Sequence, residues 1–140
     1  MNQPSPAPSG KRLAPCDLLI AVLANLPSQE FRIFDPSDIV NALYRVSKNP
    51  RFTEAFSACI FDEDGIDPEC RDLTLGLDML QQSAMLGRLN PYLTNYKVSD
   101  ALVRLYRRSL SGAMDAGFVK DLASTVFDEI RGLVPALNNA

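Results

Sequence analysis

The stretch that decides the fold is Leu73–Leu102, which reads LTLGLDMLQQSAMLGRLNPYLTNYKVSDAL. Its first part repeats apolar residues at helical spacing, and Gly87 closes that pattern. Asn90-Pro91 is a turn signal, after which the residues up to Val98 alternate as in a half-buried strand. Ser99-Asp100 is typical of a helix start. The stretch therefore predicts a helix, a β-hairpin and a second helix, in that order.

Towards the N-terminus, helix starts and stops divide the chain in the same way. Pro27 cannot continue a helix, Asp35 can cap one, and Asn49-Pro50 breaks the apolar pattern that follows Asp35. The elements expected here are a helix over 17–26, a strand over 31–34, a helix over 36–47, a short helix around Phe52, Phe56 and Ile60, and a helix over 68–85. Residues 1–12 hold Pro4, Pro6 and Pro8 and are expected to form a disordered tail.

Towards the C-terminus, a wing over 87–98 and a helix over 100–110 precede a final helix over 118–134. Apolar residues of this last helix recur with the spacing of a coiled-coil seam, widened by Phe118, Leu122 and Phe127. Such a stripe belongs either to a core helix or to a packing surface for a second subunit. The residues expected at a protein interface, with a homodimer as one outcome, are Phe118, Val119, Leu122, Val126, Phe127, Ile130 and Leu133.

The order of these elements over residues 13–110 resembles the winged helix-turn-helix superfamily. Leu80–Gly87 is similar to the end of the third helix, and Tyr96–Ser99 is similar to the returning wing strand. The resemblance implies a mainly α fold with a small antiparallel β-sheet, a winged-helix-like domain followed by a C-terminal helix within 111–140. One departure is that Lys48–Asp67 separates the second and third helices, where a compact helix-turn-helix has a tight turn.

Composition excludes several classes of chemistry. The 140 residues include no histidine, which removes Ser-His-Asp and Cys-His catalysis and His-ligated zinc. The seven glycines are dispersed and form no phosphate-binding loop. The acidic loop at 62–69 lacks the glycine and glutamate positions of a calcium-binding EF-hand, so we expect a solvated loop. We therefore expect a protein that is not an enzyme and uses no cofactor, metal or small-molecule substrate.

Cysteine use and hydropathy indicate the compartment. Cys16, Cys59 and Cys70 are an odd number at unrelated spacings, which predicts reduced thiols in a cytoplasmic protein. The longest apolar run, Leu18–Leu26, is much shorter than the twenty or so residues that a membrane-spanning helix needs. We expect no contact with a membrane.

Charge separates two functional hypotheses. Residues 61–80 carry a net charge of −6, whereas residues 81–110 carry +4. DNA binding needs Lys and Arg against phosphates, and the acidic segment enters the helix that would read the major groove. We therefore expect a protein-interaction or regulatory subunit, and winged helices serve as such modules in multi-protein assemblies. The alternative is a DNA-binding transcriptional regulator, for which the candidate residues are Arg88, Lys97, Arg104, Arg107, Arg108, Gln81 and Gln82.

Overall fold

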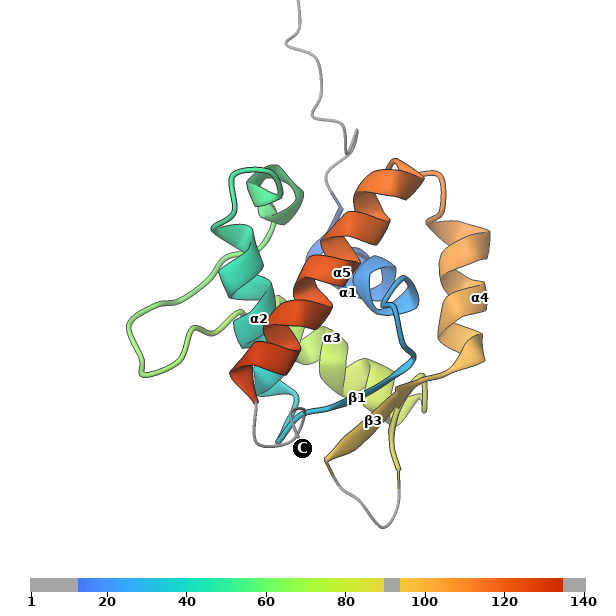
Figure 1. The fold of residues 1–140 in the computed structure, drawn as a ribbon, viewed down its shortest axis with the longest axis horizontal. Coiled ribbons are helices and arrows are strands. Elements are labelled where there is room, and N and C mark those ends of the chain that lie inside the picture. Colours follow the sequence, from blue (N-terminus) through green and yellow to red (C-terminus); the bar gives the residue numbers. More distant parts are fainter. Residues whose placement is uncertain (1–12, 90–93, 135–140) are drawn as a thin grey trace, which may run out of the picture.

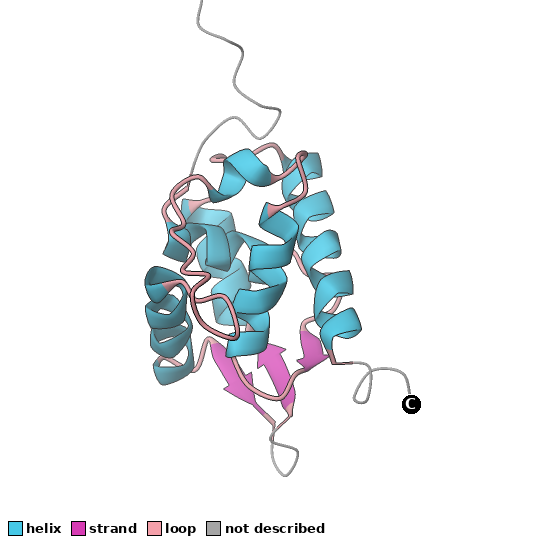
Figure 2. Cartoon of the chain, turned by 90° about the vertical axis from the view of Figure 1, so that its left-hand side faces the viewer, coloured by secondary structure: helices cyan, strands magenta, loops and turns pink. Residues whose placement is uncertain are grey.

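Helices dominate the fold, and a small sheet closes one end of them (Figure 1, Figure 2). A computed structural model of the protein describes residues 13–89 and 94–134. The helices in these ranges are α1 (Pro15–Ala24), α2 (Ser37–Ser47), the 3-10 helix η1 (Thr53–Phe56), α3 (Arg71–Gln82), α4 (Asp100–Ser109) and α5 (Ala116–Leu133). The strands are β1 (Glu30–Arg32), β2 (Leu86–Arg88) and β3 (Asn95–Val98). The predicted mainly α fold with a small antiparallel sheet and a C-terminal helix is confirmed.

The sheet has the order β1-β3-β2, and both of its pairings are antiparallel. Tyr96 in the central strand lies opposite Phe31 on one side and Arg88 on the other. Tyr96 and Val98 are buried and Lys97 is exposed, so the alternation predicted for this strand is confirmed over 95–98. The Asn90-Pro91 turn, with the two residues after it, lies outside the described residues, as do the tail 1–12 and residues 135–140.

Helix α1 is the centre of the core. It is buried from Leu18 to Leu23 without interruption, because α3, α4, α5 and η1 all pack against it (Figure 1). A helix that is apolar all round is one that neighbours cover on every side. Helix α5 also packs against α2, so its buried residues belong to the same core as those of α1 and α2.

Two helices start at side-chain caps. Ser99 Oγ accepts a hydrogen bond from the backbone N–H of Leu102 at 3.2 Å, as the sequence predicts for α4. Asp115 Oδ2 accepts one from the N–H of Phe118 at 3.0 Å at the start of α5. Each cap satisfies a backbone donor that the first turn of a helix leaves unpaired.

Several predicted boundaries need correction. Helix α3 is shorter at both ends than the predicted 68–85, because Glu69 is drawn into a backbone bridge with Asp62 and Ala84 adopts a left-handed conformation with φ of 63°. The strand predicted over 31–34 lies over Glu30–Arg32. The short helix expected around Phe52, Phe56 and Ile60 is η1, which ends at Phe56; Ile60 lies beyond it and is 81% exposed.

Candidate functional site

The outward side of α3 carries two large apolar side chains. Leu73, Leu77 and Leu80 face the core, as the sequence predicts. Leu75 and Met79, one helical turn apart on the opposite side, are 48% and 62% exposed. Burial of the first set explains why this side of the helix packs on the core, whereas much of the surface of Leu75 and Met79 is left exposed.

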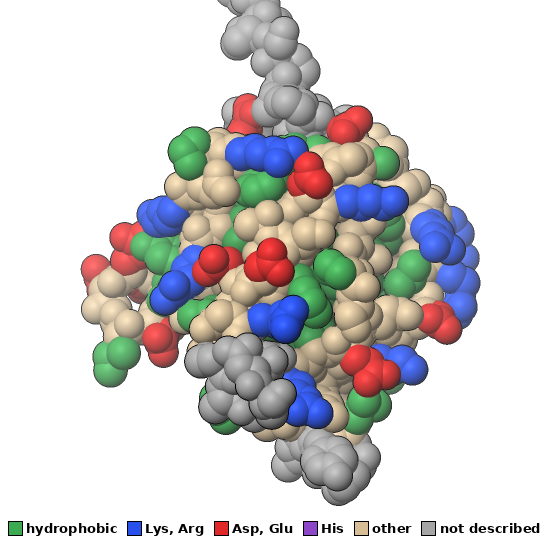
Figure 3. All heavy atoms as spheres, viewed as in Figure 1, with side chains coloured by type: hydrophobic (Ala, Val, Ile, Leu, Met, Phe, Trp, Pro, Cys, Tyr) green, Lys and Arg blue, Asp and Glu red, His purple; other side chains and the backbone are tan. Residues whose placement is uncertain are grey.

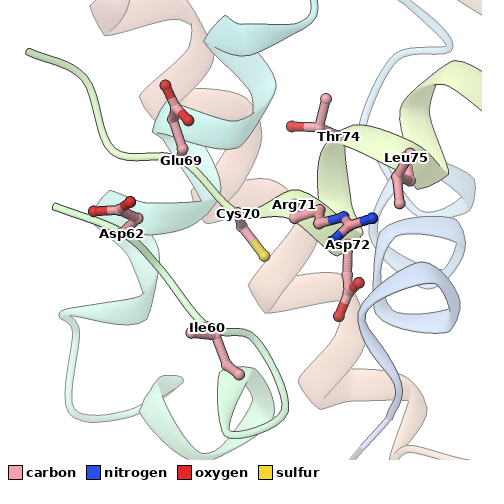
Figure 4. A pocket seen from close by; sticks show the side chains of 8 residues that line it. All are labelled: Ile60, Asp62, Glu69, Cys70, Arg71, Asp72, Thr74 and Leu75. Atoms are coloured by element: carbon pink, nitrogen blue, oxygen red, sulfur yellow. The ribbon is translucent and has the colours of Figure 1, made fainter. Parts of the chain in front are cut away.

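A hollow of about 620 Å³ lies between the start of α3 and the loop that precedes it (Figure 4). The residues that line it are Ile60, Asp62, Glu69, Cys70, Arg71, Asp72, Thr74 and Leu75. Backbone hydrogen bonds between Asp62 and Glu69, at 2.7 and 2.9 Å, hold the two sides of the loop together. This pairing brings Ile60 to the same hollow as Leu75, although fourteen positions separate them in the sequence.

We call this region the α3 surface, and it consists of Ile60, Leu75 and Met79 with the carboxylates of Asp62, Glu69, Asp72 and Asp78. Large hydrophobic side chains are rarely exposed elsewhere. Of the five that are exposed within residues 13–89 and 94–134, four lie on α3 or on the loop before it, and the fifth is Phe34. None of the ion pairs between described residues uses a carboxylate of the α3 surface. The surface is therefore apolar in part and strongly acidic.

The start of the loop before α3 is held to the C-terminal end of α2. Tyr44 Oη and Lys48 Nζ donate hydrogen bonds to Glu63 Oε2 at 2.6 and 3.1 Å. These contacts hold the pKa of Glu63 below its ordinary value, and the hydrogen bond from Tyr44 has the largest effect. The Tyr44 ring also meets the Phe61 ring edge to face, with centroids 5.3 Å apart. The aromatic pair and the shared carboxylate fix the end of the loop that adjoins Ile60.

The basic residues predicted from charge counts lie on different faces. Arg104, Arg107 and Arg108 are exposed along α4 and form a row of cations at the right-hand edge of the molecule (Figure 3). Arg88 shares a sheet face with Tyr96, and its guanidinium carbon lies 5.1 Å from the centre of that ring. Lys97 points to the other face, because successive residues of a strand alternate. Arg88 and Lys97 therefore lie on opposite faces of the sheet.

The two predicted glutamines lie at the C-terminal end of α3. Gln81 donates its side-chain N–H back to the carbonyl of Leu77 at 3.4 Å, so part of its hydrogen-bonding capacity is used within the helix. Gln82 is exposed and follows Met79 by three residues, which places it on the outward side of α3.

Helix α5 does not present the predicted interface residues to solvent. Phe118, Val119, Leu122, Val126 and Ile130 are all at most 5% exposed and belong to the core of this chain. The other two, Phe127 and Leu133, are partly buried and pack against that core. The expectation that this stripe contacts a second subunit is therefore corrected, since neighbouring helices of the same chain cover it.

Cys16, Cys59 and Cys70 are free cysteines, and Cys59 and Cys70 are neighbours. Burial above all, with a contribution from the neighbouring Cys70, raises the pKa of Cys59 to about 12, so its thiol stays protonated at neutral pH. In the part of the chain that the structure describes, no three Cys, Asp or Glu side chains converge to hold a metal ion.

Sequence reasoning missed Ile60, Leu75 and Met79 as site residues. Leu75 and Met79 were recognisable in principle, since they repeat at a spacing of four outside the buried set. Comparison with protein-family models, with curated proteins and with solved structures finds no match to the chain. None of the helices in the described ranges has the length and apolar content needed to cross a membrane.

Proposed function

We propose that the protein is a non-enzymatic interaction or regulatory module of winged-helix type, which acts as an accessory subunit by docking to another protein. The single observation that carries the proposal is the apolar and acidic α3 surface. Support for the winged-helix assignment comes from the order α1-β1-α2-α3-β2-β3, with β1 paired to the strand that returns from the hairpin.

The side chains on the outward side of α3 bear on the choice between a DNA and a protein partner. In winged-helix proteins that bind DNA, the third helix enters the major groove. Here the outward side of that helix carries Leu75 and Met79 between Asp72 and Asp78. Carboxylates repel phosphates, and burying apolar side chains against DNA backbone gains little, whereas a contiguous apolar patch rimmed by polar groups is typical of a protein interface. The α3 surface therefore favours a protein partner.

The test is a fluorescence-anisotropy titration of a mixed-sequence DNA duplex at low and at near-physiological salt, with light scattering to measure the mass of the protein. We expect no binding at about 10 µM protein even at low salt, where contacts to phosphates are strongest. Salt-sensitive binding at that concentration would overturn the proposal.

The second candidate is a DNA-binding regulator, and the observation that favours it is the row of exposed arginines on α4. Arg104, Arg107 and Arg108 are exposed and form no ion pair with another described residue. If this row binds phosphate, replacing all three residues with glutamine abolishes duplex binding and leaves the thermal unfolding midpoint within a few degrees, because all three residues are exposed.

A further inference from the structure

We propose that the α3 surface binds a basic amphipathic helix of a partner protein. The inference rests on the proposed function, since it takes the chain to be a docking module, and it adds where the partner binds and which chemistry it brings.

The shape of the surface favours a helix as the occupant. Leu75 and Ile60 line the hollow, and Met79 continues the apolar strip by one turn of α3. An amphipathic helix fills a strip of this kind with apolar side chains at i and i+3 or i+4. An extended strand would instead need the free edge of a sheet, and the edge strands here, β1 and β2, do not line the hollow.

The charge of the surface sets the chemistry of the partner. Asp62, Glu69 and Asp72 line the hollow together with one cation, Arg71, and Asp78 lies beside the apolar strip. None of these carboxylates forms an ion pair with a described cation, although Asp62 Oδ1 accepts a hydrogen bond from the Asp64 N–H at 2.9 Å. Lysine and arginine on the rim of a partner helix could therefore form ion pairs with them. An acidic partner would meet like charge on both sides of the strip.

A second copy of this chain does not supply the required anchors. Its most basic element, α4, exposes Arg104, Arg107 and Arg108, but Leu102 and Tyr106 of that helix are buried, and Val103 and Leu105 are partly buried against the core. Helix α4 therefore offers charge without an exposed large apolar side chain that could enter the hollow. The occupant is a different protein whose helix presents basic and apolar residues on one face.

The probe for this proposal is a short fluorescent peptide of leucine and lysine arranged as an amphipathic helix, with a leucine and glutamate peptide of the same pattern as its counterpart. Anisotropy is measured with the full chain at low salt. We expect the lysine peptide to bind, and the double variant Leu75→Ser, Met79→Ser to weaken that binding about tenfold or more, as truncation of buried anchors does. The glutamate peptide is expected not to bind.

The matched control is Phe34→Ser, which removes an exposed large side chain that lies neither on α3 nor on the loop before it, but on the link between β1 and α2. It should leave the affinity for the lysine peptide unchanged. A second double variant, Asp72→Asn with Asp78→Asn, should weaken binding at low salt and flatten its salt dependence. All the replaced side chains are exposed, so we expect each variant to keep its fold. The unfolding midpoint of each variant checks this expectation.

Two results would overturn the inference: no binding of the lysine peptide at low salt, or equal affinities for the protein and the Leu75→Ser, Met79→Ser variant. Neither result depends on DNA. If neither the lysine peptide nor the duplex binds, the α3 surface is not the docking site, and a docking role on another face of the protein stands. If the duplex binds, the proposed function itself is wrong.

Discussion

Tyr96 is the residue at which the small sheet meets the helical core. Its side chain is fully buried, its ring stacks on that of Phe31 with centroids 5.9 Å apart, and the guanidinium of Arg88 lies over the ring. Burial raises the pKa of Tyr96, and Arg88 opposes that shift. The hydroxyl is buried without a hydrogen-bond partner among the described residues. An unpaired buried hydroxyl costs free energy that packing of the ring must offset.

We therefore expect Tyr96→Phe to stabilise the protein. Removing the unpaired oxygen should raise the free energy of unfolding by about 1 kcal/mol, because the ring contacts are kept. Urea unfolding followed by circular dichroism measures the change. Tyr44→Phe is the comparison, since its hydroxyl donates to Glu63 and its loss should bring no gain. A lower unfolding midpoint for Tyr96→Phe would mean that the hydroxyl makes a stabilising contact.

At the scale of the element, the end of α3 is set by an unusual residue. Ala84 adopts φ of 63°, and the N–H of Met85 donates to the carbonyl of Leu80 at 2.9 Å. This is the helix-ending hydrogen bond of a Schellman motif, in which the left-handed position normally holds glycine. The Cβ of alanine makes this left-handed conformation strained, whereas glycine has no Cβ and adopts it freely.

Ala84→Gly is accordingly expected to raise the free energy of unfolding by about 0.5–1 kcal/mol. The same replacement in an exposed position of α4, Ala101→Gly, should lower it by up to about 1 kcal/mol, because glycine disfavours ordinary helix. Urea unfolding distinguishes the two. If both variants were destabilised equally, the left-handed turn would not be the constraint that ends α3.

The contact between α1 and α3 depends on Gly76. A Cβ at this position would lie 3.3 Å from Leu19 Cδ2 and 3.5 Å from Cys16 Sγ. Gly76→Leu should therefore cost about 2–3 kcal/mol by forcing the two helices apart. Gly132→Leu, in α5, meets open space and should not destabilise. Thermal unfolding of the pair is the measurement, and equal midpoints would contradict the close packing of the two helices.

Local signals predicted most elements correctly, and long-range pairing accounts for the differences. Ser99 and the alternation around Tyr96 act within a few residues, so they can be read directly from the sequence. The late start of α3 depends on a backbone bridge between Asp62 and Glu69, which spacing alone does not reveal. Asp62 and Glu69 also line the hollow beside α3, so the contribution of Ile60 to the candidate site could not be predicted from spacing either.

At the scale of the whole molecule, the ambiguity of α5 is resolved by what surrounds it. An apolar stripe at heptad spacing has the same sequence whether it packs within a chain or between chains. Here α1 and α2 cover it, so Val126 and Ile130 are core residues. Likewise, the exposed cations were recognisable from composition, but their distribution over α4 and two sheet faces follows from topology.

Placing a charge in this stripe should unfold the protein and not merely separate subunits. Ile130→Asp leaves a carboxylate buried without a partner, which should lower the free energy of unfolding by more than about 4 kcal/mol. Circular dichroism and light scattering are measured on the same sample. Asp128→Asn, an exposed change on the same helix, should have little effect. A folded Ile130→Asp variant of lower mass would instead indicate a subunit interface.

We propose above that the outward side of α3 contacts protein and not DNA. The most direct test is a pair of amide NMR titrations of the full chain, one with the leucine and lysine peptide and one with the mixed-sequence duplex, both at low salt. The account predicts that the peptide shifts the signals of Ile60, Leu75 and Met79 and that the duplex leaves them unchanged. Shifts of these three signals by the duplex, with none by the peptide, would contradict it.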